Sequence, residues 1–129
     1  MKKTILHPKN FPPPVRPYFS WGVKVKDATL LFISGVVALG PDGKIEDGDI
    51  EIQTRRTMEN LKVILEEGGA TLQDIIKLTV YLTSVDHIEA QSKVRSEYFQ
   101  QDQPASTLVV VKSLFRPEVL IEIEAIASI

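Results

Sequence analysis

The sequence predicts an α+β fold in which one mixed sheet carries two helices on a single face. Stretches that alternate apolar and polar residues at every second position predict strands. Two longer stretches have the 3.6-residue spacing of amphipathic helices. The predicted order is β-β-(β)-α-β-α-β-β, and the 129 residues suit a single domain covering residues 1–129.

The N-terminal segment, residues 1–17, is rich in proline: Pro8, Pro12, Pro13, Pro14 and Pro17. Such a segment cannot form a helix, so we expect an extended arm over the surface. The alternative, a proline-rich ligand for another domain, suits a disordered tail better.

Two strands are predicted next. Residues 18–25 alternate and place Phe19, Trp21, Val23 and Val25 on one apolar side. A polar turn separates them from a second strand at residues 30–34, and we expect the two strands to pair as a hairpin. Another turn follows at residues 41–43, with a short strand on either side.

The helices and the remaining strands follow from changes of period. Met58, Leu61 and Leu65 mark a helix over residues 50–67, which Gly68 and Gly69 end. A second helix, with Ala90, Val94 and Tyr98 on one stripe, is predicted at residues 85–99. The other predicted strands are residues 74–83, 106–112 and 119–127.

Two helices can cover only one face of such a sheet. Residues 107–111 are apolar at both parities, which is typical of a strand buried on both faces. No residues remain in the chain to cover the second face. The simplest cover is the same sheet of a neighbouring copy, so we expect a closed, symmetric oligomer.

Composition excludes several classes of protein. The 43% hydrophobic and 25% charged residues are typical of a folded globular chain, and the net charge of −2 disfavours non-specific nucleic-acid binding. The lack of cysteine excludes disulfides, thiolate metal sites and a cysteine nucleophile. The N-terminus lacks the apolar region of a signal peptide, and no stretch approaches the ~20 apolar residues of a membrane span. We expect a cytoplasmic protein.

No established catalytic motif is present. The sequence contains no glycine-rich phosphate loop, no HExxH and no GxSxG. His7 and His87 are isolated in the sequence, and we expect each to be a surface or loop residue. We therefore predict no metal site, because the usual imidazole and thiolate ligands are missing.

The last predicted strand carries two acidic residues on one face, Glu122 and Glu124, opposite an apolar face. The spacing alone favours a solvated face or partners in ion pairs. The alternative is that one carboxylate sits in a cleft with a raised pKa and holds a water molecule.

Four segments together resemble a known family: Gln53–Leu61, Asp74–Leu82, the pair Pro104 and Ala105, and Ile121–Ala127. In order and spacing they look like the reactive intermediate deaminase (RidA/YjgF) family over nearly the whole chain. The resemblance implies a homotrimer of chorismate-mutase-like subunits whose sheets line a central barrel. It also implies ligand sites in the clefts between subunits and hydrolysis, without a cofactor, of enamines and imines such as 2-aminoacrylate.

The resemblance also implies site residues. Tyr18 matches the family's tyrosine, Ser34 with Gly35 matches the serine that closes the second strand, and Glu122 matches the glutamate that holds water. The family's arginine, which grips the substrate carboxylate through a two-pronged hydrogen bond, falls at Ser106. A serine offers one donor and no charge, so the chain resembles an arginine-lacking branch.

Two explanations of that serine compete. Another cation replaces the arginine, either Arg16 or Arg116 on the loop before the last strand, or else the ligand has no carboxylate. Backbone N–H groups near Ser34–Gly35 and Ser106–Thr107 are expected to hold the substrate.

Our leading hypothesis is an enamine/imine deaminase whose small-molecule substrate is not the usual 2-aminoacrylate-type acid. The first alternative is a trimer that binds a small molecule without catalysis. The second is an RNA-acting translation inhibitor, against which the net charge of −2 and the lack of paired histidines both count.

Overall fold

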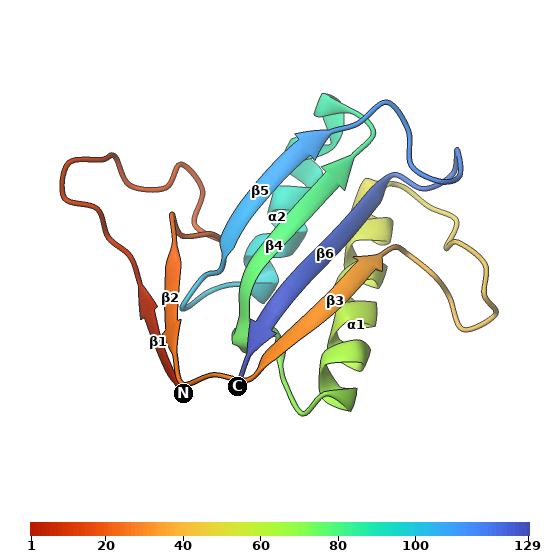
Figure 1. Ribbon diagram of the computed structural model, residues 1–129. Coiled ribbons are helices and arrows are strands. Elements are labelled where there is room, and N and C mark those ends of the chain that lie inside the picture. The colour runs from red at the N-terminus through yellow and green to blue at the C-terminus, as the bar shows by residue number, and fades with distance from the viewer.

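A four-stranded mixed sheet backed by two helices forms the protein, in a computed structural model that describes residues 1–129 (Figure 1). Strand β6 is antiparallel to both of its neighbours, whereas β4 and β5 run parallel. These pairings confirm the predicted α+β fold with one mixed sheet. In spatial order the strands are β3 (Leu30–Val36), β6 (Ile121–Ser128), β4 (Ile75–Leu82) and β5 (Ala105–Val110).

Both helices lie on the same face of the sheet, as predicted (Figure 1). The first begins where the Asp49 carboxylate accepts a hydrogen bond from the N–H of Ile52 at 3.0 Å, and it ends before Gly69, whose φ of 78° suits glycine. Neither helix is long and apolar enough to cross a membrane. The helical elements are α1 (Ile50–Glu67), α2 (Ile88–Tyr98) and the 3₁₀ turns η1 (Leu72–Asp74) and η2 (Val85–His87).

The core lies between the helices and the sheet. The predicted apolar stripe of α1 is buried there, and so is the apolar side of each long strand. Because these side chains alternate along β4 and β6, the other side of both strands is left to carry polar groups. The fully buried members include Met58, Leu61, Leu65, Leu78, Val80, Leu82, Ile121 and Ile123.

The N-terminal region differs from the prediction. Strand β1 (Lys2–Ile5) lies within the expected arm and pairs with β2 (Val23–Lys26), so the predicted hairpin between residues 18–25 and 30–34 is wrong. The reason lies just after the turn, where Thr29 and Ile129 exchange both backbone hydrogen bonds, at 2.7 and 3.0 Å. The chain therefore joins β6 instead of folding back on β2.

Over residues 18–21 the buried side is the reverse of the apolar side identified from the sequence, whereas Val23 and Val25 of β2 are more buried than the lysines that alternate with them, as predicted. Tyr18 and Ser20 are buried, whereas Trp21 is 40% exposed. Hydrogen bonds explain the reversal, because the Tyr18 hydroxyl pairs with Ser92 of α2 and the N–H of Ser20 donates to the carbonyl of Pro104. Polar side chains with buried partners thus face the core.

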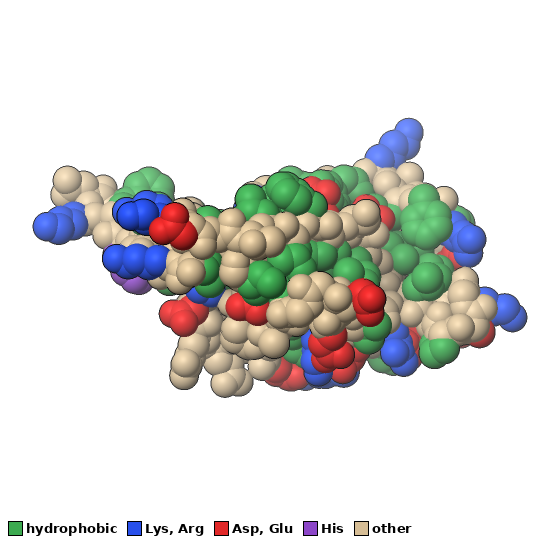
Figure 2. All heavy atoms as spheres, turned by 60° about the horizontal axis from the view of Figure 1, so that its bottom comes forward, with side chains coloured by type: hydrophobic (Ala, Val, Ile, Leu, Met, Phe, Trp, Pro, Cys, Tyr) green, Lys and Arg blue, Asp and Glu red, His purple; other side chains and the backbone are tan.

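The second face of the sheet has no helix on it. Phe32 is 74% exposed there and Leu30 is 46% exposed. Strand β5, predicted to be buried on both faces, is instead the edge of this sheet in the single subunit, where Val109 and Val110 stay exposed. Figure 2, in which the lower end of the sheet in Figure 1 is turned toward the viewer, shows hydrophobic side chains among charged ones over the middle of the molecule. We call the face of the sheet that carries no helix the open face.

Candidate active site

Strand β6 presents two carboxylates to the open face. Its opposite side is buried against the helices, so the predicted alternation along this strand is confirmed. The Tyr81 hydroxyl of the neighbouring strand donates to Glu124 at 2.9 Å. The carboxylate of Glu122, by contrast, accepts no hydrogen bond from the chain, although its backbone is part of the sheet. One carboxylate is therefore held in place, and the other is free to bind a ligand or water.

The surroundings of Glu122 raise its pKa. Burial is the larger cause, since a half-buried carboxylate loses hydration, and the negative charge of Glu124 adds to it. The hydrogen bond to Glu124 in turn raises the pKa of Tyr81. Glu122 is thus a stronger base than an exposed glutamate, which is the property that general-base catalysis near neutral pH requires.

A β-bulge at Ser34 and Gly35 brings Gly35 next to this carboxylate. The pairing of β3 with β6 is regular up to Ile33 and resumes at Val36, so Ser34 and Gly35 together oppose one residue of β6. A Cβ atom built at Gly35 would lie 2.7 Å from Cδ of Glu122. The absence of a side chain at Gly35 therefore leaves room for the carboxylate, which any side chain would displace.

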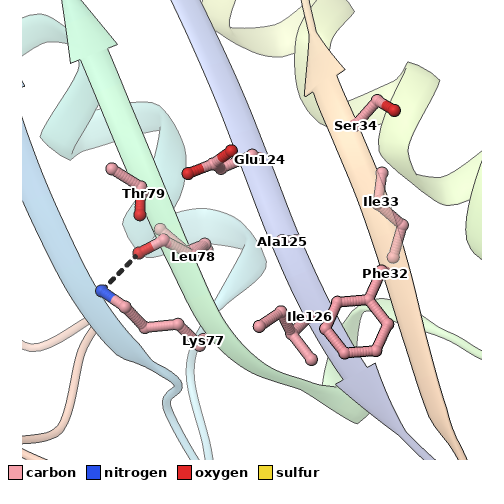
Figure 3. A pocket seen from close by; sticks show the side chains of 9 residues that line it. All are labelled: Phe32, Ile33, Ser34, Lys77, Leu78, Thr79, Glu124, Ala125 and Ile126. Carbon is pink, nitrogen blue, oxygen red and sulfur yellow. Dashed lines mark hydrogen bonds between the residues drawn. The ribbon is translucent and has the colours of Figure 1, made fainter.

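A depression of about 440 Å³ lies on the open face beside these residues. Figure 3 shows its lining from β3, β6 and β4, with Ser34, Glu124 and Lys77 around it. The ammonium of Lys77 donates to the carbonyl of Leu78 at 3.2 Å and to the Thr107 hydroxyl at 2.7 Å. Burial lowers the pKa of Lys77, while the charge of Glu124 acts in the opposite direction.

The other expected binding residues lie at the far edge of the sheet. Ser106 belongs to β5, which β4 and β6 separate from β3 (Figure 1). Its hydroxyl accepts a hydrogen bond from Nη2 of Arg95 at 2.9 Å. Arg95 also lies over the Tyr18 ring, with its guanidinium carbon 4.4 Å from the ring centroid. A single chain therefore separates the predicted site residues into two groups.

We name these groups by their strands. The acid half comprises Glu122, Ser34 and Gly35 on β6 and β3, and the cation half comprises Tyr18, Ser106 and Arg95 around β5 and α2. Sequence reasoning missed Arg95, which lies outside the predicted stripe of Ala90, Val94 and Tyr98. The side of α2 that is buried instead contains Gln91, Ser92, Val94 and Arg95, and no periodicity in the sequence indicated this.

The two arginines considered as replacements for the family's arginine lie elsewhere. Arg16 forms a two-pronged pair with the Glu89 carboxylate, so its charge already has a partner. Arg116 lies over the ring of Phe115 on the exposed loop between β5 and β6, 5.4 Å from its centroid. Neither joins Ser106 in a hydrogen bond.

The two histidines belong to neither the acid half nor the cation half. His7 is exposed in the N-terminal arm, and His87 is half-buried at the end of η2. No group of three or more histidine or acidic side chains is arranged to hold a metal ion.

Comparison with known proteins assigns the chain to a family. Residues 9–129 match the family model described as Endoribonuclease L-PSP. A RutC family protein of Pyrococcus abyssi is 42% identical over 98% of each chain, and the 3-aminoacrylate deaminase RutC of Acinetobacter baylyi is 32% identical over the full length of both.

Comparison with solved structures supports the same family. YyfB, a conserved Rid family protein of Yersinia pestis, superposes over the whole of both chains with a TM-score of 0.91 at 32% identity. A protein of Thermotoga maritima described as a putative endoribonuclease covers 98% of this chain and 97% of its own, with a TM-score of 0.73 at 41% identity. The chain therefore belongs to the RidA/YjgF family, the family of the Endoribonuclease L-PSP model.

Proposed function

We propose that the protein hydrolyses a reactive enamine or imine to the carbonyl compound and ammonia. The observation that carries this proposal is the Glu122 carboxylate, which is free of hydrogen bonds, has a raised pKa and lies directly over Gly35. The full-length similarity to a 3-aminoacrylate deaminase supports the same reaction class.

The chemistry requires little from the protein. The enamine tautomerises to the imine, and Glu122 accepts a proton from a water molecule as its oxygen attacks the imine carbon. That proton passes to the nitrogen and gives the carbinolamine. The hydroxyl proton of the carbinolamine then moves through Glu122 to the nitrogen as the C–N bond breaks, so ammonia leaves and the carbonyl forms. Holding the water and the imine carbon together accounts for most of the rate enhancement, since the reaction is intrinsically easy.

The complete site would lie between subunits of a homotrimer. The acid half and the cation half are at opposite edges of one sheet, and the open face between them exposes Phe32 and Leu30. Closing three such sheets into a ring buries the apolar surface and brings the β3 edge of one copy to the β5 edge of the next. Each seam then contains one acid half and one cation half.

The substrate side of the proposal depends on position 106. A serine at this position cannot form the bidentate hydrogen bonds that an arginine makes to a carboxylate. The sequence by itself therefore favours a substrate other than the 2-aminoacrylate-type acid.

Ammonia release from imines generated in situ tests the reaction. We expect Glu122→Gln to lower turnover by about 10²-fold or more, the range of general-base catalysis. Glu124→Gln is the matched control, because it removes the same charge from the same strand but leaves the free carboxylate. Equal losses in both variants, or no ammonia from the wild type, would refute the assignment of Glu122.

A non-catalytic binder is the first alternative, favoured by the absence of an arginine at position 106. Saturable binding of an imine or keto acid without any turnover would support it. The second alternative, an RNA-acting protein, is motivated by the family's description as an endoribonuclease. RNA affinity that falls steeply with salt concentration would favour that alternative.

A further inference from the structure

Arg95 is a buried cation without an acidic partner. Its side chain is 0% exposed, and none of the five ion pairs in the chain includes it. Nη2 donates to Ser106, Nη1 donates to Oε1 of Gln91 at 3.3 Å, and Nε has no partner. Burial lowers the pKa of Arg95 to about 10, so the guanidinium remains charged at neutral pH.

A positive charge in such surroundings is costly unless something compensates it. The face of the Tyr18 ring provides part of the compensation through a cation–π contact. The amide oxygen of Gln91 provides a neutral dipole. No acidic group of the chain pairs with Arg95. An anion bound near this edge of the sheet would therefore be stabilised by the unpaired guanidinium.

Ser106 is the group that connects this cation to the surface. Its hydroxyl oxygen accepts the hydrogen bond from Arg95 and makes no other hydrogen bond within the chain. A serine hydroxyl has one proton to donate, and that proton must therefore point away from the arginine. Since the cation polarises the hydroxyl, Ser106 offers a strengthened donor to whatever lies beside it in the seam.

The surrounding hydrogen bonds hold the guanidinium still. Gln91 donates to Ser92 at 3.0 Å, and the Ser92 hydroxyl pairs with Tyr18 at 2.8 Å, which closes a ring of contacts back to the arginine. An exposed arginine would move to follow a ligand. Here its position is fixed before any ligand arrives, so the field at Ser106 is preorganised.

We propose that Arg95 is a positioning residue that gives the site a preference for a substrate with a carboxylate, acting through the Ser106 hydroxyl. This inference rests on the proposed function, since it specifies the substrate class as a small imino or enamino carboxylic acid. It revises the expectation that Ser106 removes carboxylate selectivity. The positive charge that the family's arginine would place on β5 is here supplied by Arg95 of α2, and the Ser106 hydroxyl transmits its effect to the ligand.

Calorimetric binding to the assembled, full-length protein tests the inference with two probes, pyruvate and its neutral amide, pyruvamide. We expect the wild type to bind pyruvate about tenfold or more tightly than pyruvamide, as a charge-assisted hydrogen bond should. Arg95→Met should lose that preference by weakening pyruvate alone. Arg95→Lys should keep part of it, and Arg55→Met, which removes a surface arginine, should keep all of it.

Ser106→Ala separates the relay from a structural role of the arginine. If Arg95→Met fails to assemble, Ser106→Ala decides the question, because this variant retains the cation and removes only the hydroxyl. Loss of the preference supports the proposal. Retention of the preference in Ser106→Ala, an equal weakening of both probes in Arg95→Met, or equal binding of both probes by the wild type would overturn it.

The same proteins distinguish this inference from the proposed function. A preference for pyruvate without ammonia release from 2-iminopropionate would refute the enzyme and leave the carboxylate site standing. Ammonia release without any preference between the probes would leave the enzyme standing and refute the role of Arg95.

Discussion

The two halves of the proposed site differ in how each places its charged group. The acid half keeps Glu122 half-buried and unpaired at the open face, where burial and Glu124 raise its pKa. The cation half buries Arg95 completely and shows only the Ser106 hydroxyl at the edge of the sheet. A group that exchanges protons must reach its substrate, whereas a charge that only selects a ligand can act from behind a relay.

The halves also differ in what holds them. Backbone geometry builds the acid half, since a bulge at Ser34 and Gly35 places the glycine against the carboxylate. Side-chain hydrogen bonds build the cation half, through the ring that joins Arg95, Gln91 and Ser92. Substitutions in the acid half should therefore act by steric displacement of the carboxylate. Substitutions in the cation half should act by removing hydrogen-bond partners.

The largest effect is expected from separating the subunits. Phe32→Glu places a charge on the open face, where Phe32 is 74% exposed, and should convert the proposed trimer into folded monomers without activity. Sedimentation and ammonia release measure the two consequences. Val15→Glu, a change at a more exposed position in the N-terminal arm, should alter neither quantity. An active monomer would show that one chain contains the whole site.

Mixing two inactive variants tests whether each site takes its halves from different copies. Glu122→Gln disables the acid half, and Ser106→Asp pairs with Arg95 and repels an anionic substrate. Trimers reassembled from equal amounts should recover about one quarter of the wild-type activity, because each seam draws its halves independently. Continued inactivity of the mixture would mean that both halves serve one site within one subunit.

A smaller loss is expected when only the contact between Gly35 and Glu122 changes. A methyl group at Gly35 would meet the end of a flexible side chain, so Gly35→Ala should shift the carboxylate and leave the fold intact. We expect turnover to fall by about tenfold, a typical effect of misplacing a catalytic group, with little change in Tm. Ser34→Ala serves as the control for a change in the bulge itself. An unchanged rate in Gly35→Ala would argue against the position assigned to the base.

The smallest effect concerns the stability of Glu122→Gln at different pH values. Folding raises the pKa of this carboxyl, so its stabilising contribution is complete at low pH and is lost as pH rises through the raised pKa. The variant should therefore gain in Tm relative to the wild type at pH 7 and show less gain at pH 4. Thermal unfolding at both pH values measures the difference, and a gain that is larger at pH 4 would contradict the raised pKa.

The sequence by itself determined the strands and helices that follow a clear period. The stripe of α1 and the alternation of β4 and β6 appear in the structure as predicted, because a residue's burial follows directly from its spacing in these elements. The position of Glu122 on the open face followed from the same alternation.

Only the tertiary structure decided which strands pair and which polar groups meet. The bonds between Thr29 and Ile129 draw β3 away from the predicted hairpin, and those of Tyr18 and Ser20 reverse the expected buried side. Arg95 and Ser106 come from different elements, and no periodicity in either element encodes their contact. Local spacing specifies a local pattern, whereas a contact between distant segments depends on packing and hydrogen bonding across the whole fold.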